Sequence, residues 1–337
     1  MEKVISVENL GKKFKYRERK EGVIASLKSY INPQYRVKHA LTDISMEINQ
    51  GELVGFIGPN GAGKTTTIKL LSGILHPSEG SIEVLGYNPF KRQADFLRQI
   101  SIIAGNKSQL SWDLPAIDSY HLLKNVYGLN NDFFEKQLKY LSKSFEITDL
   151  LHRPVRQMSL GERMKSELVA ALLHNPKILF LDEPTLGLDV VSQRNFREMI
   201  KEYNKKSGTT IILTSHYMKD IKELCNRVIV INQGHKIFDG LLSELEKKYN
   251  RQRKISISLD RKVSNYAEIL ESISSRIAVI KNNQDQIIDL LVDNVEATEV
   301  ISKVFRALPI IDISIEELDM DDIISNFYLE GKKTNVG

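Results

Sequence analysis

The sequence predicts an α/β protein, with a mainly parallel β-sheet that helices cover on both faces, followed by a smaller α+β module. Three observations indicate this fold class. First, short apolar runs typical of buried strands recur along the chain, at residues 53–57, 178–181, 210–214 and 228–231. Second, helical patterns lie between these runs, and strands that alternate with helices form parallel sheets. Third, the pattern changes after Gly240 to short strands of alternating polarity.

The N-terminal region predicts two short strands, at residues 4–7 and 40–48, with a basic insertion of about residues 15–38 between them. The basic side chains that crowd around its start are Lys12, Lys13, Lys15, Arg17, Arg19 and Lys20. Two interpretations of the insertion stay open: a solvated loop, or a contact with acidic lipid headgroups or a membrane partner.

Further along, the pattern divides the chain into two domains. Residues 1–240 form the first domain, and about residues 90–174 within it are mostly helical and predict a subdomain. Residues 241–337 predict a separate α+β domain. Its expected strands lie at 254–259, 287–292 and 310–315, and its expected helices at 266–273 and 295–308.

Composition is that of an ordinary globular protein. With 337 residues, 42% of them hydrophobic, the chain can bury a substantial core. No stretch reaches the ~18 uncharged apolar residues that cross a bilayer, and no signal peptide is visible, so we expect a soluble, cytoplasmic chain. A net charge of +4 is too balanced to argue for a nucleic-acid partner. The single cysteine, Cys225, excludes an internal disulfide, and its apolar neighbours favour a buried packing role.

Residues 58–66 match the G-x-x-x-x-G-K-[ST] pattern of a phosphate-binding loop between a strand and a helix. The loop consists of Gly58, Pro59, Asn60, Gly61, Ala62, Gly63, Lys64, Thr65 and Thr66. Its glycines let backbone N–H groups surround phosphate oxygens, Lys64 reaches the β and γ oxygens, and the Thr65 hydroxyl can ligate magnesium. The helix that follows points its positive N-terminus at the phosphates. The sequence therefore predicts a nucleotide site that uses Mg²⁺.

Asp182 and Glu183 follow the apolar run 178–181, at the strand edge where open parallel sheets bind ligands. Asp182 can hold the magnesium through water, and Glu183 is placed to activate an attacking water as a general base. This pair, combined with the phosphate loop, favours nucleotide hydrolysis.

The segment Ser159, Leu160, Gly161 and Glu162 precedes a helical pattern and carries a capping box, with Ser and Glu three residues apart. A capped helix start offers N–H groups and a partial positive charge, which also suit a γ-phosphate. Because the phosphate loop already surrounds its own nucleotide, we expect this second anion site to serve the nucleotide of another copy. That predicts a head-to-tail pair of subunits.

The order of these motifs resembles that of the ATP-binding subunits of ABC transporters. The motifs are the phosphate loop, Ser159-Leu160-Gly161-Glu162, Asp182-Glu183-Pro184, Gly187-Leu188-Asp189 and Thr214-Ser215-His216. The resemblance covers about residues 1–245, and segments 114–127 and 159–197 are similar to the drug-efflux (daunorubicin-resistance-like) branch. It implies a P-loop NTPase core in which an antiparallel β subdomain and a helical subdomain adjoin the mainly parallel sheet.

The resemblance also implies roles for matching residues. Asp189 would lie at the dimer seam, and His216 would contact the γ-phosphate and hold Glu183 and water in place. Phe14 would stack on adenine, with Tyr16 as the alternative aromatic and core packing as the alternative role. Asn106 would touch magnesium and relay motion to the membrane subunit, with Gln109 as the alternative.

The chain departs from the family pattern at two places. The family's signature usually carries two glycines and a glutamine, whereas this chain has Leu160, Gly161 and Glu162, which predicts a weaker approach to phosphate. Asn106 stands where the family has a glutamine, and its side chain is one methylene shorter.

The function that the resemblance implies is an ATPase that uses ATP and Mg²⁺, pairs as a homodimer, and energises export through integral membrane permease subunits. The cargo would be a drug, antibiotic or other amphiphile, and the subunit would be peripheral at the cytoplasmic face of the cell membrane. The alternatives are a soluble ABC-type ATPase of translation or DNA repair, and a regulatory nucleotide-binding module with little turnover. No second cassette or long coiled-coil insertion is visible, and intact Lys64, Glu183 and His216 argue against the regulatory module.

Overall fold

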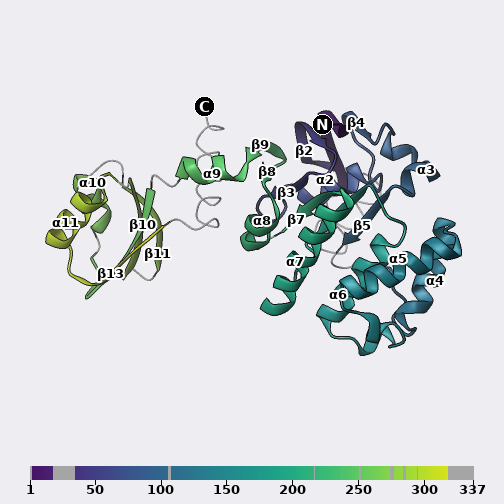
Figure 1. The fold of residues 1–337 in the computed structure, drawn as a ribbon. Helices are drawn as coiled ribbons and strands as arrows, with labels where there is room; N and C mark the ends of the chain where they lie inside the picture. The colour runs from purple at the N-terminus through teal and green to yellow at the C-terminus, as the bar shows by residue number, and fades with distance from the viewer. Residues whose placement is uncertain are drawn as a thin grey trace, which may run out of the picture. The chain divides into compact units, whose positions relative to one another are not determined.

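A computed structural model of the chain describes residues 2–17, 35–104, 108–215, 217–249, 252–263, 265–273, 277–283, 286–293 and 295–317. The chain divides into two compact units, Met1–Gly240 and Leu241–Gly337 (Figure 1). Each unit has a hydrophobic core of its own. Among the described residues, no helix combines the length and the apolar character that a bilayer crossing requires.

The first unit contains a six-stranded sheet with the order β5-β6-β7-β3-β8-β9. The strands are β3 (Leu53–Ile57), β5 (Ile100–Ala104), β6 (Ile178–Asp182), β7 (Thr210–Thr214), β8 (Arg227–Asn232) and β9 (His235–Leu241). The four pairings from β5 to β8 are parallel. Every residue of β6 and β7 is buried, as expected for strands covered on both faces. The predicted α/β class is therefore confirmed.

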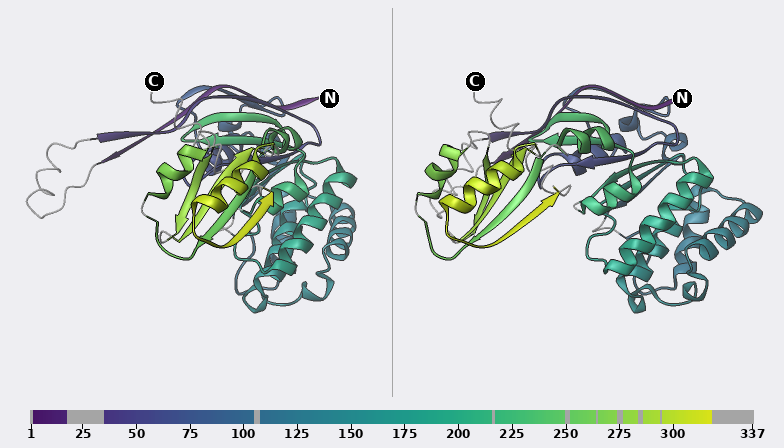
Figure 2. Two further views of the ribbon diagram at one scale, coloured as in Figure 1. Left: turned by 90° about the vertical axis from the view of Figure 1, so that its left-hand side faces the viewer. Right: turned by 60° about the vertical axis from the view of Figure 1, so that its left-hand side comes forward.

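A second sheet of the first unit is antiparallel, with the order β2-β1-β4. Its strands are β1 (Lys3–Arg17), β2 (Tyr35–Asn49) and β4 (Glu79–Val84). Beyond the last β4 partner, Gly11, residues 13–17 pair with residues 35–39 as a two-stranded ribbon, which we call the basic ribbon. Figure 2 shows its strands side by side at the outer end of the sheet. The interpretation of residues 15–38 as a loop is thus wrong for the described residues at its two ends. These residues extend β1 and β2, and their backbones pair with Lys15 opposite Val37.

The described part of the first unit also contains seven α-helices. They are α2 (Lys64–Leu71), α3 (Ala94–Leu97), α4 (Ala116–Tyr127), α5 (Asn131–Ser144), α6 (Leu160–Leu172), α7 (Val190–Ser207) and α8 (Met218–Leu224). Short 3₁₀ helices lie at Pro89–Lys91, Thr148–Leu150 and Val155–Gln157. Helices α4, α5 and α6 lie together in Figure 1.

The expected, mostly helical stretch of about residues 90–174 is interrupted by a strand that the sequence did not predict. Strand β5 lies inside it and pairs in parallel with β6, with α3 before the strand and α4, α5 and α6 after it. Five consecutive residues, Ile-Ser-Ile-Ile-Ala, supply β-branched side chains that suit a sheet edge next to β6.

The second unit is a four-stranded antiparallel sheet with the order β11-β12-β10-β13. Its elements are α9 (Leu242–Tyr249), β10 (Gln252–Leu259), α10 (Tyr266–Ile273), β11 (Ala278–Asn283), β12 (Ile287–Asp293), α11 (Ala297–Ala307) and β13 (Ile310–Glu317). From β10 onward this is a β-α-β-β-α-β arrangement of the ferredoxin-like type. Val300 and Val304 of α11 contribute to its core. The expected α+β pattern is present, with β11 as a strand that the sequence did not predict.

Candidate nucleotide-binding site

The phosphate loop connects β3 to α2, and two of its glycines adopt backbone angles that favour glycine. Gly61 has a φ of 78° and Gly63 a φ of 120°. Gly58 is required for a different reason: a Cβ there would lie 2.2 Å from the carbonyl oxygen of Ile231 at the end of β8. The loop therefore follows a path that other residues cannot copy without backbone movement.

Lys64 is buried at the start of α2. Its Nζ donates hydrogen bonds to the carbonyl oxygens of Gly58 (2.6 Å) and Pro59 (3.2 Å). Burial lowers the pKa of this amine, while the nearby carboxylates of Glu183 and Asp182 act in the opposite direction. The ammonium group thus lies beside the loop that would hold the phosphates.

Asp182 ends β6, and its side chain links this strand to α2 and to β7. Its Oδ1 accepts hydrogen bonds from the hydroxyls of Thr65 (2.9 Å) and Thr214 (2.7 Å). The Thr65 hydroxyl and the Asp182 carboxylate are hard oxygen donors next to the phosphate loop. Mg²⁺ is usually bound through one or two such protein oxygens, together with water and phosphate oxygens, so these residues fit that ion.

Glu183 has a φ of 55°, a left-handed conformation that is uncommon for a residue other than glycine. Its N–H donates to the Thr214 carbonyl oxygen and hydroxyl, both at 3.1 Å, and these bonds help to hold the conformation. Such outliers occur frequently at functional sites. The geometry directs the chain away from the sheet immediately after Asp182.

A pocket of about 200 Å³ brings several of the predicted residues together. It is lined by Phe14, Lys38, Ala40, Asn60, Gly61, Ala62, Gly63, Lys64, Thr65, Thr66 and Glu183. Phe14 is directly opposite Lys38 in the β1–β2 ladder. Tyr16, the alternative aromatic, is outside this lining. The sequence did not predict Lys38, since only the strand register shows that it shares a face with Phe14.

Ser159 caps α6 with the predicted capping box. Its Oγ accepts from the N–H of Glu162 (3.2 Å), and a Glu162 carboxylate oxygen accepts from the N–H of Ser159 (2.8 Å). Arg153 forms an ion pair with the same carboxylate at 3.1 Å. The pKa of Glu162 is lowered, mainly by the hydrogen bond from the Ser159 backbone. The Ser159 side chain and Arg153 make smaller contributions in the same direction. The carboxylate of Glu162, which stands where the family usually has a glutamine, is therefore bound by groups of its own chain.

Asp189 caps α7, with its carboxylate accepting from the Ser192 N–H (2.9 Å) and hydroxyl (2.6 Å). The starts of α6 and α7 are close: a Cβ on Gly161 would lie 2.5 Å from the Ser192 Oγ. The exposed apolar side chains in these two segments are Leu160, Leu186, Val190 and Val191.

Two predicted residues, Asn106 and His216, lie outside the described residues. Gln109, the alternative to Asn106, is described and does not line the phosphate-loop pocket. Its side-chain amide donates to the Ile102 carbonyl oxygen of β5 (3.2 Å), and its N–H donates to Glu167 of α6 (3.0 Å). In this arrangement its side chain faces β5 rather than Lys64.

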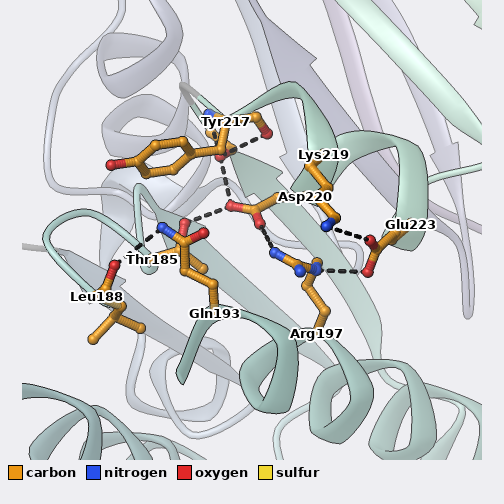
Figure 3. A network of polar contacts seen from close by, with 9 residues as sticks. Thr185, Leu188, Gln193, Arg197, Tyr217, Lys219, Asp220 and Glu223 are labelled. Carbon is orange, nitrogen blue, oxygen red and sulfur yellow. Dashed lines mark hydrogen bonds and ion pairs between the residues drawn. The ribbon is translucent and has the colours of Figure 1, made fainter. Parts of the chain in front are cut away.

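A buried network that the sequence did not predict lies beside the site (Figure 3). At its centre, the carboxylate of Asp220 on α8 contacts Arg197 (2.8 Å), Thr185 (2.5 Å) and Ser215 (2.8 Å). Arg197 also donates to Glu223 (2.6 Å). Single polar residues in a helical pattern give no signal for such a network.

The chain is similar in sequence to ATP-binding proteins of one family. Residues 41–186 match the ABC transporter family. The chain is 37% identical over 210 residues to the ABC transporter ATP-binding protein NatA of Bacillus subtilis (strain 168), covering 62% of this chain and 85% of NatA. It is 34% identical over 215 residues to the linearmycin resistance ATP-binding protein LnrL of the same strain, covering 64% of this chain and 68% of LnrL.

Among solved structures, the ATP-binding subunit of an ABC transporter superposes with a TM-score of 0.59 at 26% identity, covering 73% of this chain and 93% of that one. The chain therefore belongs to the ATP-binding subunits of ABC transporters. It is an ATPase with the fold of that family.

Proposed function

We propose that this chain binds ATP with Mg²⁺ and, as one of two paired subunits, hydrolyses it to energise export through separate membrane permease subunits. The observation that carries the proposal is the pocket in which the phosphate loop, buried Lys64 and Glu183 face one another next to Asp182. This arrangement combines groups that bind the phosphates with a carboxylate that can act as a base. Hydrolysis of a phosphoanhydride needs both.

Each residue has a distinct task in this proposal. The backbone of residues 58–66 and the Lys64 ammonium bind the phosphates. Thr65 and Asp182 hold Mg²⁺, and the ion neutralises phosphate charge when bound. Glu183 accepts a proton from the attacking water, and His216 orients Glu183 and that water. Phe14 stacks on the adenine ring at the outer wall of the pocket.

Pairing of two subunits is supported by the surface around the α6 and α7 starts. The capped N-terminus of α6 offers an anion site that does not line the pocket of its own chain. Exposed Leu160, Leu186, Val190 and Val191 surround it, and side chains of this kind favour a protein contact over solvent. A second copy would therefore supply Ser159 to each nucleotide, with Asp189 at the seam.

Export of a drug, antibiotic or other amphiphile is proposed from the relatives. LnrL is a resistance protein by name, and the chain is similar to it over most of the first unit. As an ATP-binding subunit, the chain would act with integral membrane permeases at the cytoplasmic face of the cell membrane. The basic ribbon, with exposed Lys15, Tyr35 and Val37, is proposed as its contact with acidic lipid headgroups. No nucleic-acid partner is proposed.

The test is Glu183→Gln, which keeps the shape of the side chain and removes the base. ATP binding should persist while hydrolysis falls by about 10²-fold or more, and the variant should accumulate as an ATP-bound dimer. Glu135→Gln on the exposed surface of α5 makes the same chemical change away from the site and should hydrolyse normally.

Near-normal hydrolysis by Glu183→Gln would remove its assigned role. ATPase activity of the unaltered chain that rises with nucleic acid, rather than with permease-containing membranes, would favour the translation or repair class. ATP binding without turnover in the unaltered chain would favour a regulatory module.

A further inference from the structure

The buried carboxylate of Asp220 binds side chains from three different segments of the first unit. Asp220 has no exposed surface. Its Oδ1 pairs with Arg197 Nη1 at 2.8 Å, and its Oδ2 accepts from the hydroxyls of Thr185 (2.5 Å) and Ser215 (2.8 Å). Figure 3 shows Arg197 of α7 and Thr185 of the segment after β6 converging on the carboxylate, and Ser215 belongs to the segment after β7.

Two of these partners lie close in sequence to residues with proposed roles in hydrolysis. Thr185 is two residues after Glu183, and Ser215 directly precedes His216. Arg197 belongs to α7, the helix that Asp189 caps. The Ser215 hydroxyl also accepts from the Tyr217 N–H (3.0 Å), so Asp220 is linked to both sides of position 216.

Arg197 and Asp220 form an ion pair within the core. Arg197 is only 3% exposed, and it contacts Glu223 as well as Asp220. Burial alone would lower the pKa of the Arg197 guanidinium, but the hydrogen bonds and negative charges of Asp220 and Glu223 together outweigh burial and raise that pKa. A buried, fully satisfied ion pair of this kind holds a fixed geometry, and loss of one partner leaves an unpaired charge.

We infer that Asp220 is a positioning residue that fixes the segment after β6 and the segment after β7 relative to each other. The inference rests on the proposed roles of Glu183 and His216, which those segments carry. A misplacement of about 1 Å at a catalytic group can cost roughly 10²-fold in rate. Loss of either hydroxyl contact should therefore slow hydrolysis without weakening ATP binding, because neither Thr185 nor Ser215 lines the phosphate-loop pocket.

The experiment removes the two hydroxyls rather than the charges, so that Arg197 keeps its partner and the fold is preserved. Thr185→Val and Ser215→Ala should each lower kcat about tenfold or more, with the KM for ATP changed less than about twofold and the melting temperature nearly unchanged. The double variant should lose less than the product of the two effects, because both hydroxyls act through one carboxylate. Ser215→Thr restores a hydroxyl and should recover most of kcat.

Glu223→Gln is the matched control. Glu223 also contacts Arg197, but its side chain is 42% exposed and it touches neither segment, so kcat should stay unchanged. Unchanged kcat in both Thr185→Val and Ser215→Ala would overturn the inference. A fall in kcat accompanied by an equal loss of ATP binding and of thermal stability would also overturn it, since that is the signature of a purely structural contact.

Glu183→Gln, measured in the same series, separates this inference from the proposed function. If Glu183→Gln stops hydrolysis while both hydroxyl variants hydrolyse normally, only the positioning role is wrong. If Glu183→Gln itself hydrolyses normally, the base assignment is wrong and the positioning inference fails with it.

Discussion

Individual buried polar residues of the first unit differ in how completely their hydrogen bonds are satisfied. Asp182 accepts two side-chain hydrogen bonds and Asp220 accepts three. His174, after α6, is less well satisfied. Its Nε2–H donates to the Ile100 carbonyl oxygen (3.0 Å), but its buried Nδ1 has no partner within the described part of the chain. Its ring stacks on Tyr127 with centroids 3.8 Å apart.

This environment makes His174 a source of acid sensitivity. Burial lowers its pKa from 6.5 to about 4, against the opposing effect of the bond to Ile100. Between pH 6.5 and pH 4, the unfolded chain therefore binds a proton at His174 that the folded chain does not. The free energy of unfolding must fall as the pH falls through this range. Between pH 7 and pH 5 the loss from this one group is about 2 kcal/mol.

His174→Gln should weaken that pH dependence, because an amide can still donate to Ile100 and does not titrate. We expect the difference in unfolding free energy between pH 7 and pH 5 to shrink by about 2 kcal/mol. Urea unfolding followed by the fluorescence of Trp112, the single tryptophan, measures it. An unchanged pH slope would show that the histidine titrates normally in the folded chain.

At the scale of elements, the sequence predicted best where a motif and a buried strand coincide. The phosphate loop, Asp182-Glu183 and the Ser159 capping box all lie beside strands or helices with strong patterns, and the structure has those elements. Strand β5 was missed because five residues between helical patterns give little periodic signal. The pocket position of Lys38 and the Asp220 network were missed for another reason, since both arise from contacts between segments that are distant in sequence.

The basic ribbon is the element for which a membrane role was proposed. Cross-strand partners share a face, so Lys15 and Val37 project together, with exposed Tyr35 close to them on the same strand as Val37. Each basic residue near an acidic membrane surface contributes about 1 kcal/mol to binding. Lys15→Glu should thus lower the affinity for vesicles that contain phosphatidylserine roughly tenfold, and added salt should weaken binding of the unaltered chain.

Co-sedimentation with vesicles measures this binding, and Lys201→Glu on the exposed surface of α7 makes the same charge change elsewhere. Equal losses in the two variants would mean that net charge, not the ribbon, governs binding. No binding of the unaltered chain to acidic vesicles would contradict the ribbon proposal outright.

At the scale of the whole molecule, the proposed pair makes each active site the product of two chains. In a two-fold symmetric dimer, each pocket combines the phosphate loop of one copy with the α6 N-terminus of its partner. Lys64→Ala damages the first part and Ser159→Arg the second, so each variant alone should be inactive. A dimer that contains one copy of each variant regains one intact site, because the unaltered Lys64 and the unaltered Ser159 then face the same nucleotide.

If the two variants mix freely in equal amounts, about half of the dimers contain one copy of each. Each mixed dimer has one of its two sites intact. If single sites turn over independently, the ATPase activity should therefore return to about a quarter of the unaltered level. Two different affinity tags, purified in sequence, isolate the mixed dimers for direct assay. If hydrolysis requires both sites to fire together, isolated mixed dimers should still trap ATP at one site per pair. Mixed dimers that neither hydrolyse nor trap ATP would mean that Ser159 does not serve the partner's nucleotide, and the exposed apolar surface around α6 would need another occupant.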